Sequence, residues 1–167
     1  MTLFPILLEM KRLLKNMDGW LDKASAHAAA KGYEANVLLQ ARLAPDMFPL
    51  VRQLQSACDN AKFAAAFTTG KEPPVHADTE QTFEEVRARI AAVTGYLDGF
   101  TAKDFEGTDS RTVRRPRWEG KSMTATDYFI EQAMPNFFFH LTTAYVILRH
   151  NGVDVGKRDY LGQINLR

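Results

Sequence analysis

Apolar residues recur at steps of three and four along most of the chain and predict long amphipathic helices. The first such stripe consists of Leu3, Ile6, Met10, Leu13, Met17, Trp20 and Ala24. Gly32 follows it and is a suitable C-terminal stop. The first helix should therefore have roughly 25 residues and be about 37 Å long, a length typical of helix bundles.

A second helix is expected to begin near Asp46, because a carboxylate at that position can accept hydrogen bonds from free backbone N–H groups. Pro49 is then tolerated in the first turn. The stripe continues to Gly70, and its lower half is rich in alanine. Two prolines in residues 71–78 predict a loop after this helix.

The second half of the chain predicts two more helices separated by an irregular segment. Thr82 and Glu85 form a possible capping box for the third helix. Residues 108–124 break the helical pattern and indicate a small β-hairpin or an extended crossover. The last helix should run from about Thr126 to His150, with Pro135 kinking it or splitting it in two. The polar tail that follows is expected to pack on the outside.

Composition indicates a single domain over residues 1–167. The chain is 46% hydrophobic, and its 21 basic residues nearly balance 20 acidic ones, so no large net charge is available to attract nucleic acid or anionic lipid. No apolar run approaches the roughly 20 residues that span a bilayer, and the N-terminus is a poor signal peptide. We therefore expect a cytoplasmic protein that does not contact the membrane. The single cysteine, Cys58, is expected to be a small core residue.

The last helix carries the most informative polar residues. Asn136, His140 and Thr143 fall on one line at helical spacing, just after Pro135. His140 also shares a stripe with apolar residues and should face the interior. A buried imidazole is most simply a neutral ring bonded to a neighbour, but a metal ligand or a general base stays open.

Two further places could supply partners for His140. His27 falls at the end of the first apolar stripe, where a helix-end histidine near a free carbonyl is the simpler interpretation. On the second helix, a polar line with charge pairing predicts an exposed face. The alternative places Gln55 and Asp59 beside the apolar stripe, where they would reach His140 in a buried polar site. His76, in the proline loop, is expected to be solvated.

A basic segment lies between the third and the last helix. It contains the residues Arg111, Arg114, Arg115 and Arg117 with Trp118. These could pair with nucleic acid and stack on its bases. A solvated hairpin that pairs with acidic residues elsewhere in the chain is favoured, so we do not expect nucleic-acid binding.

Long motifs in the sequence resemble the bacterial DUF1993 family. They are residues 41–50 (ARLAPDMFPL), then Gln55, Asp59 and Lys62, then residues 135–140 (PNFFFH) with Thr143, Ala144, Leu148, Arg149 and Gly152, and finally residues 157–162 (KRDYLG). The family is similar to the DinB-like proteins. The resemblance implies an all-α, up-down-down-up four-helix bundle, with the small hairpin or crossover before the last helix, that often forms a homodimer.

Two hypotheses about function follow. In the first, Gln55, Asp59, Asn136, His140 and Thr143 form a buried polar site that binds a small molecule or simply fixes the bundle. In the second, which the DinB-like resemblance implies, the protein is an enzyme that uses a divalent metal such as zinc or nickel for thiol transfer or related chemistry. His140 and Asp59, with His27 or Gln55, would then be the ligands. A regulator that binds nucleic acid is a third and less favoured hypothesis.

Overall fold

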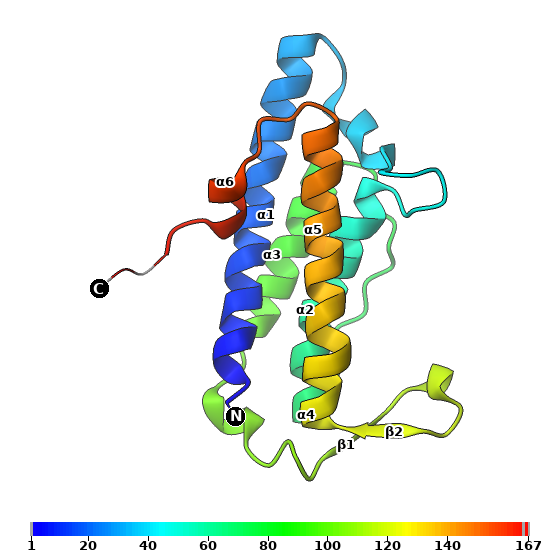
Figure 1. Ribbon diagram of the computed structural model, residues 1–167, viewed down its shortest axis with the longest axis vertical. Helices are drawn as coiled ribbons and strands as arrows, with labels where there is room; N and C mark the ends of the chain where they lie inside the picture. The colour runs from blue at the N-terminus through cyan, green and yellow to red at the C-terminus, as the bar shows by residue number, and fades with distance from the viewer. Residues whose placement is uncertain (1, 165, 167) are drawn as a thin grey trace.

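The computed structural model describes residues 2–164 and residue 166. Four long helices form a bundle (Figure 1): α1 (Phe4–Lys31), α2 (Leu50–Thr69), α3 (Phe83–Leu97) and α5 (Met134–His150). The shorter elements are η1 (Ala35–Gln40), η2 (Ala102–Phe105), β1 (Thr112–Arg114), η3 (Pro116–Trp118), β2 (Ser122–Thr124), α4 (Ala125–Asp127), η4 (Tyr128–Ala133) and α6 (Lys157–Leu161). The predicted all-α class is confirmed.

The helices follow an up-down-down-up order, with α2 and α3 parallel (Figure 1). Two hydrogen bonds at opposite ends of this pair show the direction. Gln55, near the start of α2, donates to the carboxylate of Glu80, just before α3, at 2.7 Å. Tyr96, near the end of α3, donates to the carbonyl of Glu72, just after α2, at 3.0 Å. The connection between them must therefore run the length of the bundle.

The first helix follows its apolar stripe closely. Met10, Met17 and Trp20 on α1 are buried in the core, together with Phe129 and Phe137 from the last helical segment. The helix stops at Gly32, which adopts a left-handed conformation with φ of 76°. The predicted length and stop signal of this helix are both confirmed.

The predicted start of the second helix at Asp46 is wrong. Pro49 has an extended backbone with ψ of 165°, and α2 begins at Leu50. A proline disfavours the helical conformation in the residue before it, so Phe48 cannot belong to the helix. The first turn is fixed instead by the Leu50 N–H, which donates to the carbonyl of Ala41 at 2.8 Å.

The last helix is divided as Pro135 predicted. A short α-helical turn, α4, leads into a π-helical segment, η4, and α5 starts just before the proline. The ring therefore occupies the first turn of a new helical segment, where its missing N–H is tolerated. The predicted capping box of Thr82 and Glu85 on α3 is also present.

The hairpin and the tail complete the fold. β1 pairs antiparallel with β2, with Val113 opposite Met123, which confirms the predicted small hairpin. The tail does not lie wholly on the outside, because Val153 and Val155 are fully buried. Across the described residues, no helix is both long and apolar enough to cross a membrane.

Candidate functional site

A buried arginine is the centre of a polar cluster between α2, α3 and their connection. The Arg89 side chain is only 2% exposed. Its guanidinium contacts the carboxylates of Asp59 at 2.8 Å, Asp78 at 2.7 Å and Glu80 at 2.9 Å. Asp59 lies on α2, whereas the other two acids lie on the crossover, so one cation ties three segments together.

Lys62 extends the cluster along α2. It is 2% exposed, and its ammonium pairs with Asp59 at 2.7 Å. The same ammonium lies 2.9 Å from Nδ1 of His76. An ammonium can only donate, so Nδ1 accepts and His76 is neutral. The exposed face expected on α2 is wrong, because Gln55 and Lys62 are buried. His76, which was expected to be solvated, is half-buried and hydrogen-bonded.

The ionisation of the cluster follows from its contacts. Burial is the largest single influence on the pKa of Glu80 and would raise it, but the hydrogen bonds with Arg89, the backbone and Gln55 and the charge of Arg89 together outweigh burial, so the pKa is lowered. Burial would lower the pKa of Arg89, but its carboxylate partners raise it. Burial, then the charges of Lys62 and Arg89, lower the pKa of His76. The charged partners pair with one another, as in a structural ion network, and the buried Nε of Arg89 is left without a hydrogen-bond partner among the described residues.

His140 lies apart from this cluster, half-buried on α5. Its Nδ1 is 2.7 Å from Oε1 of Gln53. The Gln53 amide nitrogen donates to the carbonyl of Phe48 at 3.2 Å, which assigns its oxygen to the histidine. His140 therefore donates from Nδ1 and keeps a lone pair on Nε2. Burial, followed by the charge of Arg52, lowers the pKa of this ring.

The other predicted site residues do not join His140. Gln55 bonds with Glu80, and Asp59 pairs with Lys62 and Arg89. Asn136 donates to the carbonyl of Gln132 at 2.6 Å, and Thr143 to that of Phe139 at 2.7 Å, both within the last helical segment. The structure thus assembles Gln55 and Asp59 in one cluster, leaves His140 with Gln53, and uses Asn136 and Thr143 on their own helix.

These residues do not fit the divalent-metal site that the resemblance implies. A catalytic metal usually needs three protein donors. Within residues 2–164 and 166, no three His, Cys, Asp or Glu side chains lie together as a possible metal site. His140 offers one ring nitrogen, and Asp59 is already paired with two cations. The Cys58 thiol is buried, which raises its pKa to about 12 and keeps it protonated.

Two arginines of the hairpin hold it on the bundle. Arg115 stacks on the rings of Phe67 and Phe63, with its guanidinium carbon 4.1 Å and 5.1 Å from their centroids. Arg111 donates to the carbonyl of Thr68 at 2.5 Å. The acidic partners expected for the hairpin arginines are not found, since no salt bridge of the described residues includes one. Cation–π contact and a backbone acceptor take their place.

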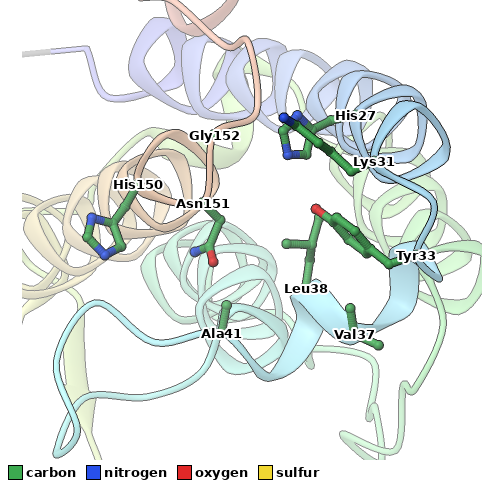
Figure 2. Close-up of a pocket in the computed structure, with 9 residues that line it drawn as sticks. All are labelled: His27, Lys31, Tyr33, Val37, Leu38, Ala41, His150, Asn151 and Gly152. Carbon is green, nitrogen blue, oxygen red and sulfur yellow. The ribbon is translucent and has the colours of Figure 1, made fainter.

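An open pocket lies at the end of the bundle, where α1, η1 and the turn after α5 meet (Figure 2). It has a volume of about 730 Å³. Its lining residues are His27, Lys31, Tyr33, Val37, Leu38, Ala41, His150, Asn151 and Gly152. We call it the end pocket. Figure 2 shows the Tyr33 hydroxyl directed towards His27, whereas the His150 ring points away from the centre.

His27 is held in place from two sides. Its ring meets that of Tyr33 edge to face, with centroids 6.1 Å apart. On the other side, a Cβ on Gly152 would lie 3.1 Å from Cε1 of His27, closer than ordinary packing allows. Gly152 also has φ of 87°. The turn after α5 therefore needs glycine both for its backbone and for the histidine beside it.

Several of these residues were missed in the sequence. Tyr33 lies beyond the stop of the first helix, where the periodic pattern ends and gives no direction for a side chain. Gln53 lies in the helix whose start was predicted wrongly, and its spacing did not indicate a contact with His140. Arg89 had a readable signal, because it falls between Val86 and Val93 on the buried face of its helix.

The family model described as "Domain of unknown function (DUF1993)" matches residues 6–161. The chain belongs to the DUF1993 family. A crystal structure of a DinB family member protein from Shewanella denitrificans is 47% identical, with a TM-score of 0.93. The match covers 96% of this chain and 92% of that one. This DUF1993 protein therefore has a DinB-like fold. No curated protein matches its sequence.

Replacing Arg89 by methionine should destabilise the DUF1993 bundle by about 3–5 kcal/mol, because three carboxylates lose their shared buried cation. Urea denaturation measures this change. Arg87→Met is the matched control. Arg87 lies on the same helix and pairs with Asp18 and Asp22, but its side chain is 29% exposed, so its loss should cost no more than about 1 kcal/mol. Equal losses in the two variants would contradict a structural role for the cluster.

Acid should weaken the contact of His76 with Lys62. The pKa of His76 is lowered from its usual value of 6.5. Its contribution to stability is therefore complete above that value and is lost as the pH falls through the lower pKa of the folded state. His76→Asn supplies an amide oxygen that does not titrate. Its free energy of unfolding should decline less than that of the wild type between about pH 7.5 and about pH 5.5.

Asp78 and Glu80 do not confuse this measurement, because their pKa values are lowered and both stay ionised over that range. The control is His150→Asn, because His150 is an exposed residue at the C-terminal end of α5. A pH profile of His76→Asn that coincides with the wild-type profile would refute the neutral acceptor role.

Gly152→Ala should destabilise the protein more than Gly32→Ala. Both glycines have positive φ, which costs alanine about 1–2 kcal/mol. Only Gly152 has a side chain against its Cβ position, that of His27, whereas Gly32 has open space. We expect a further loss of about 1 kcal/mol at Gly152 from this crowding. His27→Ala should remove the extra loss in a double-mutant cycle, and an unchanged difference would disprove the contact.

Proposed function

We propose that this DUF1993 protein binds a small molecule in the end pocket. The observation that carries the proposal is the convergence of side chains from three separate segments on a cavity of about 730 Å³. Ligand pockets of proteins typically have volumes of about 300–1,000 Å³ and combine an apolar wall with a few polar groups. The end pocket has both components.

The apolar wall comes from η1 and the residue that follows it. Val37, Leu38 and Ala41 present aliphatic surface. Val37 is 58% exposed, so its side chain can be covered further by a ligand. The polar groups are His27, near the end of α1, and Tyr33, two residues beyond that end. A ligand with one apolar and one polar end would satisfy both sides of the pocket.

The Arg89 cluster and the His140 pair support a structural rather than a ligand-binding role. The acids and cations of the cluster are engaged with one another, and His140 is fixed by Gln53. The residues that the sequence grouped with His140 are thus divided between different contacts, and we propose the binding function for a different place. The homodimer expected from the family resemblance stays a prediction.

A fragment screen by NMR tests the proposed function. With uniformly ¹⁵N-labelled protein, fragments that bind should shift the amide signals of η1, of Tyr33 and of the turn after α5. Val37→Trp should fill the mouth of the pocket and weaken every such hit by at least about tenfold. Val75→Trp is the control, since Val75 is 95% exposed in the crossover loop. No hits, or hits that are unaffected by Val37→Trp, would refute the proposal.

A further inference from the structure

The polar groups of the end pocket all favour the same kind of ligand. None of its nine lining residues is acidic. Lys31 brings an ammonium group, Tyr33 a hydroxyl, and His27 an imidazole. In the described part of the chain, no salt bridge includes Lys31. Its charge is therefore available to a ligand.

These three donors lie around one part of the cavity. His27 and Lys31 are four residues apart on α1, which places them on the same face of the helix. The chain turns at Gly32, so that the ring of Tyr33 packs against that of His27. Figure 2 shows the Tyr33 hydroxyl and the Lys31 and His27 side chains on the same side of the pocket. A single oxyanion could meet all three.

The helix ends at the pocket do not prevent anion binding. The C-termini of α1 and α5 carry partial negative charge. Some of their last carbonyls accept hydrogen bonds: Tyr33 N–H donates to the carbonyl of Ala28 at 3.1 Å, and Val153 N–H donates to that of Leu148 at 3.1 Å. Lys31 in the last turn of α1 further offsets that charge. Lys31, Tyr33 and His27 are the side chains of this wall that can donate to an anion.

We propose that the end pocket binds a small carboxylate with an apolar body. The carboxylate accepts from Lys31, Tyr33 and His27, and the apolar body packs on Val37, Leu38 and Ala41. This inference rests on the proposed function, since it names the ligand class for the same pocket. It assigns no reaction to the protein.

A set of three probes with one apolar body tests the ligand class. They are 3-phenylpropionate, its uncharged amide and 3-phenylpropylamine. Titrations followed by ¹⁵N NMR should give the carboxylate at least about fivefold tighter binding than the amide, because a charge-assisted hydrogen bond is stronger than a neutral one. The amine should bind most weakly. Added salt should weaken the binding of the carboxylate and leave the binding of the amide unchanged.

Matched variants locate the charge. Lys31→Met should reduce carboxylate affinity by at least about fivefold and leave amide affinity unchanged, because only the charged contact is lost. Tyr33→Phe should weaken both probes by a smaller factor. Lys15→Met is the control: it removes the same charge from an exposed position on the same helix, well away from the pocket.

The outcomes separate this inference from the proposed function. Equal binding of carboxylate and amide, or no effect of Lys31→Met, would overturn the carboxylate assignment while fragment binding in the pocket stands. Tighter binding of the amine would overturn it as well. If no fragment of any charge binds at the end pocket, the proposed function fails, and the carboxylate inference fails with it.

Discussion

Burying one guanidinium constrains how this chain can fold. A charged side chain that is 2% exposed must be surrounded by opposite charge, and the neighbouring helix supplies only Asp59. The remaining acids come from the crossover, as Asp78 and Glu80. Their contact with Arg89 fixes the long connection against the bundle. Only with that connection in place can α2 and α3 run parallel, because a parallel pair needs a return path along its whole length.

The same ion network also influences the position of η1 beside the end pocket. Once the crossover is fixed, its last residues lead into α3 beside η1, where the Phe83 N–H donates to Asn36 at 2.9 Å. That bond joins η1 to the start of α3. Because η1 carries the apolar wall of the pocket, the position of Val37 and Leu38 depends on a buried ion network that makes no contact with the proposed ligand. The ion network and the proposed binding pocket are therefore separate sites that the backbone connects.

Periodicity predicted the long helices well, because each buries one continuous stripe of side chains. It failed where prolines and long-range contacts decide. Asp46 has the chemistry of a cap, but it lies in a turn, and Pro49 keeps Phe48 out of the helix, so α2 begins only at Leu50. The charged residues on α2 have the spacing of an exposed face, yet Lys62 is buried, since its partner His76 arrives from a distant loop. Tyr33 follows a left-handed turn, and no local pattern indicates where such a side chain will point.

His140 shows why resemblance to a fold does not transfer a site. A histidine on the last helix of a DinB-like bundle suggests a metal ligand. Here Gln53 accepts a hydrogen bond from Nδ1–H of His140, and its amide nitrogen donates to the carbonyl of Phe48. Burial and the charge of Arg52 keep the ring neutral. Its remaining lone pair on Nε2 has no second and third donor beside it among the described residues. The same helix scaffold thus supports an amide–histidine pair, and the groups able to converge on a ligand lie instead at the end of α1.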